Sequence, residues 1–380
     1  MNEAKKDIGK AKRSWSPGKE RWCFLGLPFD SLTMEDVCSF IEDSIENKTT
    51  STLSASNINW VVFARREPVF CEHIACSDLN VMDGFPLFWG ARFLGLPIQE
   101  RIAGPTIIER LMELKNGLRK KVYFLGGPDD SAQKACSWLK DSGGGLTGVG
   151  YCNPGFGSVD EMSSESLFKD IDRAAPDMLV LAIGAQKGMA WIEKNKKKIT
   201  VGVLSYLGAV INLLAGHVKR APIWMQEMGL EWTWRIFQEP KLWRRYLHDG
   251  LILMKMIVTR LVPLKIVVSC NKHFENERRF PGIVLAEHTE RVVIRFEGVC
   301  NRFGRNEIMK VFLNAASLAK DVEVDLEGTQ YIESSFLGNL FSLWRELRKT
   351  SRNLSIVGAN VNIRRIFYLS MVDQFFKVGR

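Results

Sequence analysis

One carboxylate stands inside an apolar stretch of the chain, the run LNVMDGFPLFW from Leu79 to Trp89. This residue, Asp83, lies between Met82 and Gly84. A carboxylate taken out of water is usually hydrogen-bonded, raised in pKa or used in chemistry. An Asp-Gly pair is also a common turn, because aspartate tolerates the backbone geometry of turns. The stretch alone therefore leaves two alternatives, a turn residue or a general base.

A second set of residues could bind a phosphorylated ligand. The segment YFLGGPDDSAQ places Gly126 and Gly127 between a strand-like run and a helical pattern, where free amides attract phosphate. The two aspartates that follow would repel a phosphate placed on them, so the loop better suits the ribose or base of a nucleotide. Arginines can neutralise the charge of a diphosphate leaving group, although a solvated surface is their commoner role. The candidates are Arg101, Arg220, Arg235, Arg244 and Arg245.

The sequence does not favour a metal site. The segment DID, Asp170–Asp172, fits the Asp-x-Asp pattern of metal-dependent sugar transferases, but it lies within an amphipathic helical pattern. We interpret it as a solvated helix face. The five histidines are widely spread, and a lone histidine is usually structural or exposed. We therefore predict no metal and no cofactor.

The composition is that of an ordinary globular protein, with 46% hydrophobic and 25% charged residues in a chain of 380. A formal charge of +9 favours an anionic partner, such as a phosphorylated substrate or a membrane surface. Nucleic acid is not expected as a partner, because no known binding module is recognisable. The scattered cysteines are typical of a cytosolic protein. Residues 1–21 are polar and basic and are predicted to form a disordered tail.

Residues 22–236 alternate short apolar runs with amphipathic segments. Runs such as KKVYFLGG and PDMLVLAIGA are strand-like, and patterns such as SAQKACSWLKDS between them are helical. This alternation predicts an α/β fold, a Rossmann-like and mostly parallel sheet with helices on both faces. Ligands of such sheets bind at the carboxyl ends of the strands. The residues expected at those ends are Asp83, Gly126, Gly127, Gly184 and Gly208.

A basic amphipathic appendage is predicted over residues 237–268. Arg244, Arg245 and Lys255 recur at helical spacing, and Pro263 is expected to end the helix. Such a helix either docks on the domain surface or lies in an anionic membrane interface. Residues 269–280 are polar and indicate a linker. Residues 281–380 have their own alternation of strands and helices and are long enough for a small α/β domain.

Seven motifs in the first domain carry a family resemblance. In chain order they are SNINWVVFARREP, LNVMDGFPLFWGARFLG, ERIAG, YFLGG, PDMLVLAIGA, LGAVINLLAGHVKRAPIWMQEMGLEW and RIFQEPKLWRRY. Together they resemble the WecG/TagA/CpsF glycosyltransferases of bacterial surface polysaccharide synthesis. The resemblance implies inverting, metal-independent transfer of an N-acetylhexosamine-type sugar from a UDP-sugar to a polyprenyl-diphosphate-linked glycan acceptor.

The resemblance also implies roles for individual residues. Asp83 matches the family's general base and Arg101 a second catalytic residue, whereas Arg235, Arg244 and Arg245 match appendage arginines that meet the acceptor's diphosphate. The implied substrate-binding residues are Asn57, Gly84, Gly104, Gly126, Gly127, Gly184, Gly208 and Asn212.

Several positions depart from the family pattern and bear on the donor sugar; Ala55 stands where the family often has Thr, and Ile211 where it has Phe. Gly188 and Met189 stand where the family has Gln and Glu, and Thr106 and Asn212 stand where it has Asp.

The C-terminal domain has a resemblance of its own. The segments VEVDLEGTQYIESSFLGNLFSLWRELR and LSIVGANVNIRRIFYLSMVDQFF resemble the STAS domain of anti-sigma-factor antagonists. In that family a partner kinase phosphorylates a serine at the start of a helix. Ser335 is the closer match and Ser334 the alternative, but both serines could simply cap the helix. The resemblance implies regulation or recruitment through a protein partner or kinase.

These observations predict a glycosyltransferase of the cytoplasm, bound peripherally to the inner face of the cell membrane and regulated by a STAS domain. The alternative is a degenerate transferase fold that binds a nucleotide-sugar and acts as a regulator through its STAS domain.

Overall fold

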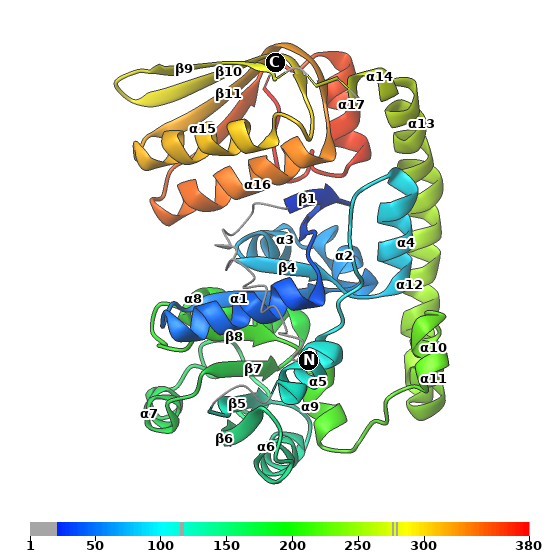
Figure 1. The fold of residues 1–380 in the computed structure, drawn as a ribbon, viewed down its shortest axis with the longest axis vertical. Helices are drawn as coiled ribbons and strands as arrows, with labels where there is room; N and C mark the ends of the chain where they lie inside the picture. Colours follow the sequence, from blue (N-terminus) through cyan, green and yellow to red (C-terminus); the bar gives the residue numbers. More distant parts are fainter. Residues whose placement is uncertain (1–20, 115–117, 276, 279, 380) are drawn as a thin grey trace, which may run out of the picture.

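The structure, a computed structural model, describes residues 21–114, 118–275, 277–278 and 280–379. Figure 1 shows an α/β core, a long helical rod along one side of it, and a second α/β domain at one end of the molecule. The predicted tail lies outside the described residues except for Arg21, which begins a strand and is fully buried.

The core is built on a parallel sheet of six strands, as predicted. The strand order is β4-β3-β8-β7-β5-β6, and every pair of neighbours is parallel. The strands are β3 (Ser51–Ser56), β4 (Leu79–Met82), β5 (Lys120–Gly126), β6 (Leu146–Cys152), β7 (Met178–Ala182) and β8 (Val203–Tyr206). Because all strands run the same way, all their carboxyl ends meet at one edge of the sheet.

Helices cover both faces of this sheet, which confirms the Rossmann-like prediction. Within β5, Val122 and Phe124 belong to one hydrophobic cluster and Tyr123 and Leu125 to the other, since successive side chains of a strand alternate between faces. The first face is covered by α1 (Met34–Glu46), α5 (Gly104–Glu113), α6 (Ser131–Asp141) and α9 (Gly208–Leu214). The second is covered by α2 (Ile58–Ala64), α3 (Pro68–Ala75), α7 (Glu165–Ala174) and α8 (Ala185–Asn195).

The rod begins beyond two short helices, α10 (Ile223–Glu227) and α11 (Glu231–Gln238), and the 3-10 turn η1 (Pro240–Leu242). It consists of α12 (Trp243–Met256), the π-helical segment η2 (Ile257–Leu261) and α13 (Val262–Cys270). The prediction that Pro263 ends the helix is wrong. The π-helical hydrogen bonds restart the helix at Val262, so Pro263 occupies the first turn of α13, where a missing N–H is tolerated. Helix α4 (Phe85–Leu94) packs between the rod and the core.

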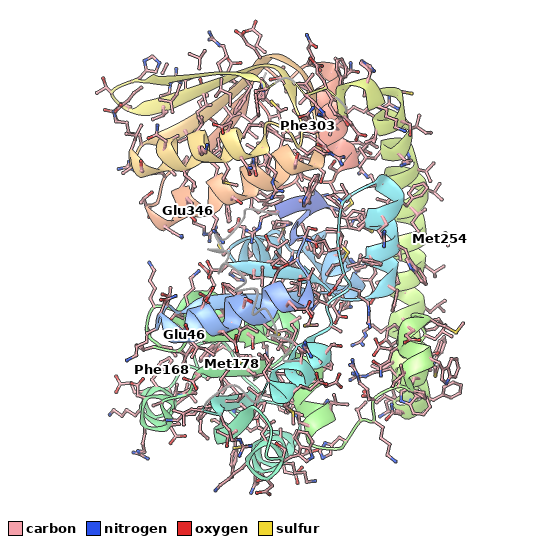
Figure 2. All side chains as sticks on the ribbon, in the orientation of Figure 1. Glu46, Phe168, Met178, Met254, Phe303 and Glu346 are labelled. Atoms are coloured by element: carbon pink, nitrogen blue, oxygen red, sulfur yellow. The ribbon has the colours of Figure 1, made fainter. Side chains whose placement is uncertain are left out.

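The rod packs apolar residues such as Met256, Leu261 and Leu264 on the core, and it also exposes apolar groups on its outer side. Asp249 is buried and accepts a hydrogen bond of 2.9 Å from the Asn59 amide of α2. On the outside, seven apolar residues, hereafter the outer stripe, are 40% to 64% exposed. The outer stripe consists of Trp243, Leu247, Leu251, Met254, Val258, Val262 and Ile266. Figure 2 shows Met254 on the side of the rod away from the core. An ordinary surface helix carries polar side chains on its exposed face instead.

The chain does not form a free linker after the rod. Helix α14 (Lys272–Glu275) follows α13, and the Asn301 amide donates hydrogen bonds of 2.8 Å to the carbonyls of Phe274 and Glu277. The prediction of a polar linker over 269–280 therefore missed a helix and its contacts with the last domain. Among the described residues, no helix is long and apolar enough to cross a lipid bilayer.

The C-terminal domain is a four-stranded sheet of order β12-β11-β10-β9, with only β9 antiparallel to its neighbour. Its elements are β9 (Gly282–Glu287), β10 (Arg291–Cys300), α15 (Arg305–Ser317), β11 (Asp321–Ile332), α16 (Ser334–Lys349), β12 (Leu354–Val357) and α17 (Val361–Leu369). The last helix ends at Leu369 because Met371 takes a left-handed conformation with φ of 62°.

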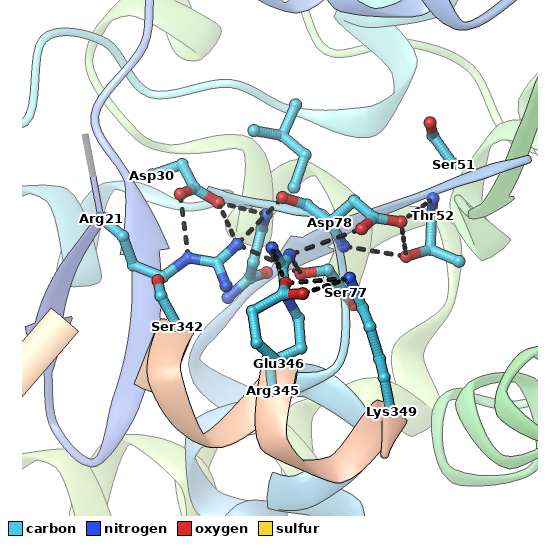
Figure 3. A network of polar contacts seen from close by, with 12 residues as sticks. Arg21, Asp30, Ser51, Thr52, Ser77, Asp78, Ser342, Arg345, Glu346 and Lys349 are labelled. Carbon is cyan, nitrogen blue, oxygen red and sulfur yellow. Dashed lines mark hydrogen bonds and ion pairs between the residues drawn. The ribbon is translucent and has the colours of Figure 1, made fainter. Parts of the chain in front are cut away.

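Helix α16 of the C-terminal domain packs directly on the antiparallel hairpin of β1 (Arg21–Phe24) and β2 (Leu27–Asp30). The approach is close at Gly338, where a Cβ atom would come within 2.2 Å of the Arg21 carbonyl oxygen. Figure 3 shows the polar network of this interface. The Ser77 carbonyl accepts hydrogen bonds from Arg21 at 3.1 Å and from Arg345 of α16 at 3.2 Å. The two domains therefore share buried polar partners.

Candidate active site

The carboxyl edge of the parallel sheet brings the predicted site residues together. Asp83 follows β4, Asn57 follows β3, and Gly126 ends β5. Gly184 and Gly208 come two residues after β7 and β8. Because these strands are neighbours in the order β4-β3-β8-β7-β5, the five residues line one continuous edge.

Asp83 lies at this edge in a conformation set by the backbone. Its N–H donates a 2.9 Å hydrogen bond to the Ser56 carbonyl, and Gly84 then turns the chain into α4 with φ of 103°. Burial raises the pKa of Asp83 to about 6. The negative charge of Glu231 also raises this pKa, whereas the positive charges of Arg101 and Arg220 lower it. At neutral pH the carboxylate is therefore mostly ionised but far more basic than an exposed aspartate, as suits a general base.

Arg101 is held beside Asp83 by backbone and side-chain contacts. The N–H of Ile102 donates a 3.0 Å hydrogen bond to the Met82 carbonyl, which brings the Arg101 segment alongside the end of β4. The guanidinium lies 4.5 Å from the ring centre of Phe85. Its Nη1 atom contacts Oε2 of Glu231 at 2.6 Å. Arg101 is thus a half-buried cation within electrostatic reach of the candidate base.

A second arginine joins this cluster from the loop between α9 and α10. Arg220 Nη2 donates a 2.7 Å hydrogen bond to the hydroxyl of Thr106, one of the positions that depart from the family pattern. Arg220 also pairs with Glu109 at 3.2 Å and with Glu231 at 3.6 Å. The sequence identified Arg220 as a possible anion-binding residue but gave no sign of Glu109 or Glu231. Their pairing joins segments that are far apart in the chain.

The predicted substrate-binding residues surround an edge rich in helix amino ends. Gly104 and Gly208 begin α5 and α9, and Gly84 and Gly184 directly precede α4 and α8. At Gly127, with φ of 91°, a Cβ atom would lie 3.0 Å from Ile211. Position 127 therefore favours glycine, and the helix amino ends place free backbone amides along this edge.

Asn212 of α9 carries an open acceptor. Its Oδ1 atom is buried and accepts no hydrogen bond from any residue that the structure describes. A buried amide oxygen without a donor is unusual in a folded protein. Nearby in the fold, the Asp130 carboxylate that follows Gly127 pairs with Lys134 at 2.9 Å and with His217 at 3.5 Å. The Lys134 ammonium therefore offsets part of the negative charge that argued against a phosphate at this loop.

The altered segment GAQKGMAW has a packing explanation. A Cβ atom at Gly188 would lie only 2.3 Å from the Tyr206 ring, so no other residue fits beside that ring. Tyr206 ends β8 and packs on Trp60 with ring centres 5.4 Å apart. The space of the family's glutamine side chain is therefore closed by a phenol ring, which the sequence did not reveal.

The appendage arginines differ in their partners. Arg235 of α11 pairs with Glu239 at 3.1 Å. Arg244 and Arg245 are exposed, and in the described part of the chain neither has a carboxylate partner. Arg245 packs 5.3 Å from the ring centre of Tyr246, and its charge opposes the rise that burial gives to the pKa of Tyr206. Arg235, in contrast, is occupied by an ion pair of its own.

No cluster of three or more metal-binding side chains is present among the residues that the structure describes. The DID segment lies on α7, where Asp170 accepts a 2.9 Å hydrogen bond from the Tyr123 hydroxyl.

The two candidate phosphorylation sites are covered by the core. Ser335 is fully buried and contacts Glu333 at 3.3 Å, and the Ser334 hydroxyl donates a 2.6 Å hydrogen bond to the Cys23 carbonyl of β1. The alternative that these serines cap α16 does not hold, because the N-cap residue is Glu333. The Glu333 side chain accepts instead from the backbone N–H of Arg302 at 2.6 Å. A kinase would reach Ser334 only after its hydrogen bond to the core is broken, and Ser335 only after its own domain opens around it.

Comparison with known proteins agrees with this architecture. Residues 22–265 match the glycosyl transferase WecG/TagA/CpsF family, and residues 283–380 match the STAS domain. The chain therefore belongs to the WecG/TagA/CpsF glycosyltransferase family and carries a C-terminal STAS domain.

Two curated relatives are described as N-acetylglucosaminyldiphosphoundecaprenol N-acetyl-beta-D-mannosaminyltransferases. The protein from Bacillus subtilis (strain 168) is 25% identical over 222 residues, covering 58% of this chain and 85% of the relative. The protein from Staphylococcus aureus (strain MRSA252) is 25% identical over 227 residues, again covering 58% and 85%. Among solved structures, the unphosphorylated anti-sigma factor antagonist SpoIIAA matches at 20% identity with a TM-score of 0.24, covering 26% of this chain and 89% of its own.

Proposed function

We propose that this chain transfers an N-acetylhexosamine-type sugar from a UDP-sugar to a polyprenyl-diphosphate-linked acceptor, with inversion at the anomeric carbon and without a metal. The observation that carries the proposal is a basic carboxylate, Asp83, beside two half-buried arginines at the edge where parallel sheets bind ligands. The relatives' printed activity, transfer of an N-acetylmannosaminyl group to an N-acetylglucosaminyl diphosphate lipid, supports this substrate class.

In the proposed reaction Asp83 removes the proton from a hydroxyl of the acceptor sugar. The resulting oxygen attacks the anomeric carbon of the donor as the bond from that carbon to the UDP oxygen breaks. The proton stays on Asp83, and the negative charge leaves with UDP. Arg101 and Arg220 stabilise that charge, because buried guanidinium groups bind phosphate oxygens strongly.

The nucleotide is proposed to bind along the remaining part of the edge. The amides around Gly126, Gly127, Gly184 and Gly208 suit the ribose and phosphates. The open Oδ1 atom of Asn212 suits an N–H donor of the base, which would satisfy a buried acceptor.

The rod is proposed to bind the inner face of the cell membrane, where a polyprenyl-linked acceptor is held. Its outer stripe exposes Trp243 and six aliphatic or methionine side chains in one line. Arg244 and Arg245 stand beside the stripe and can contact anionic headgroups or the acceptor's diphosphate. Binding to anionic vesicles at low salt should be strong, and Leu251→Glu together with Met254→Glu should abolish it.

The STAS domain is proposed to regulate the transferase or to bind a protein partner. Because α16 is docked on β1, a partner that needs the start of α16 must first separate the domains.

A direct test is UDP release from candidate UDP-sugars by the purified full chain. We expect release that depends on a polyprenyl-diphosphate-linked acceptor and is unchanged by a chelator. Loss of transfer on chelation, with recovery on adding manganese, would contradict the metal-independent mechanism. UDP-sugar binding without turnover on any acceptor would favour the alternative, a nucleotide-sugar-binding regulator.

A further inference from the structure

The two arginines nearest Asp83 are already paired with a carboxylate of the appendage. Glu231, the first residue of α11, places Oε2 at 2.6 Å from Arg101 and Oε1 at 3.6 Å from Arg220. Its two oxygens thus bridge two guanidinium groups, as two oxygens of a diphosphate would. The side chains are only 13% (Arg101), 21% (Arg220) and 27% (Glu231) exposed, so solvent screens these contacts weakly.

The charge of this cluster does not suit an incoming anion. Arg101 and Arg220 face three acidic side chains, because Glu109 and Asp83 accompany Glu231. A diphosphate added to the cluster would therefore meet arginines whose charge is already balanced. The arginines become available only if one carboxylate leaves them.

We propose that Glu231 is a positioning residue that holds the place of the donor's diphosphate and is displaced from Arg101 and Arg220 when the nucleotide binds. This inference rests on the proposed function, since it takes the anion to be a nucleoside diphosphate. Glu231 is the carboxylate that moves because it alone lies at the start of a separate helix, whereas Asp83 and Glu109 belong to the core.

Displacement of Glu231 also links the site with the appendage. The turn before α11 is held by Gly229, where a Cβ atom would lie 2.8 Å from the Phe85 ring. After Gly229, the next residue along the chain that contacts the core is Glu231, which accepts a hydrogen bond from Arg101. Its loss loosens the first turn of α11, which is then held by the 3.0 Å bond from Trp234 to the Lys219 carbonyl. Binding of the donor is thereby coupled to the segment that leads into the membrane-facing rod.

The test compares UDP binding by the full chain and by Glu231→Gln, using calorimetry at low salt. Removing the competing carboxylate should tighten UDP binding by about five-fold, and the gain should shrink at high salt. A gain in affinity cannot come from a damaged fold. Glu227→Gln is the matched control, since Glu227 is exposed and has no ion pair in the described part of the chain. It should bind UDP like the unchanged protein.

Hydrogen exchange on the unchanged protein gives a second readout that needs no variant. UDP should speed the exchange of amides in α11 (Glu231–Gln238) while slowing that of the sheet edge. Equal or weaker UDP binding by Glu231→Gln, or α11 exchange that UDP leaves unchanged, would overturn the inference while the proposed donor stands. If the unchanged protein binds no UDP at all, the proposed function and this inference both fail.

Discussion

Replacing Arg345 by methionine should loosen the contact between the STAS domain and the core. Arg345 is 5% exposed and comes from α16. Its Nη1 atom donates to the Ser77 carbonyl at 3.2 Å and lies 3.4 Å from the Asp78 carboxylate. The change removes both contacts between the domains, whereas methionine keeps much of the apolar stem.

The size of the effect follows from what remains at each partner. Asp78 keeps two hydrogen bonds of 2.9 Å from Thr52, and the Ser77 carbonyl keeps its bond from Arg21. Asp78 is therefore not left as an isolated buried charge, and the full penalty of about 3–5 kcal/mol does not apply. The loss of charged hydrogen bonds predicts about 2 kcal/mol, or roughly a thirty-fold shift in the opening of the interface.

The same helix provides a control. Arg348 pairs with Glu72 across the interface, but the two side chains are 42% and 34% exposed. An exposed ion pair contributes about 0.5 kcal/mol, so Arg348→Met should change the opening only about two-fold. Hydrogen exchange of the β1 and α16 amides measures both. Equal effects of the two variants, in folded protein, would refute the reasoning that burial sets the strength of this interface.

Two further predictions concern pH and helix stability. Because only the ionised form of Asp83 accepts a proton, kcat/KM should fall about tenfold per unit below a pH of about 6 and level off above it, as measured in a pH series. The same raised pKa means that the folded chain binds this proton more tightly than the unfolded chain does. The contribution of Asp83 to the free energy of unfolding should therefore decrease as pH rises from about 4 to about 6. Urea unfolding at a series of pH values would measure this decrease. Gly250→Ala should stabilise α12 by about 0.5–1 kcal/mol, because no atom lies within 4 Å of the added Cβ; a lower melting temperature would contradict this.

The local pattern of the sequence predicted the elements and their ends more successfully than their contacts. The parallel sheet and the positions of Asp83 and Gly126 follow from apolar runs that close on polar or glycine residues, because such runs have a fixed period. Asn57 was assigned by resemblance alone, and the structure places it at the same edge.

What the pattern could not predict depends on residues distant in the chain. Glu231 meets Arg101 across 130 positions, and Arg345 meets Ser77 across 268. Neither pairing leaves a periodic signal. Pro263 misled the prediction for a local reason, since a π-helical segment ahead of it provides a helix start that proline tolerates.

The reaction proposed here depends most directly on Asp83, and transfer by Asp83→Asn measures that dependence. The substitution keeps the shape of the side chain but removes its ability to accept a proton at neutral pH. We predict at least about a hundred-fold loss of transfer, with UDP binding retained and stability at pH 7 no lower than that of the unchanged protein. Turnover close to that of the unchanged protein, in a folded Asp83→Asn variant, would contradict the account.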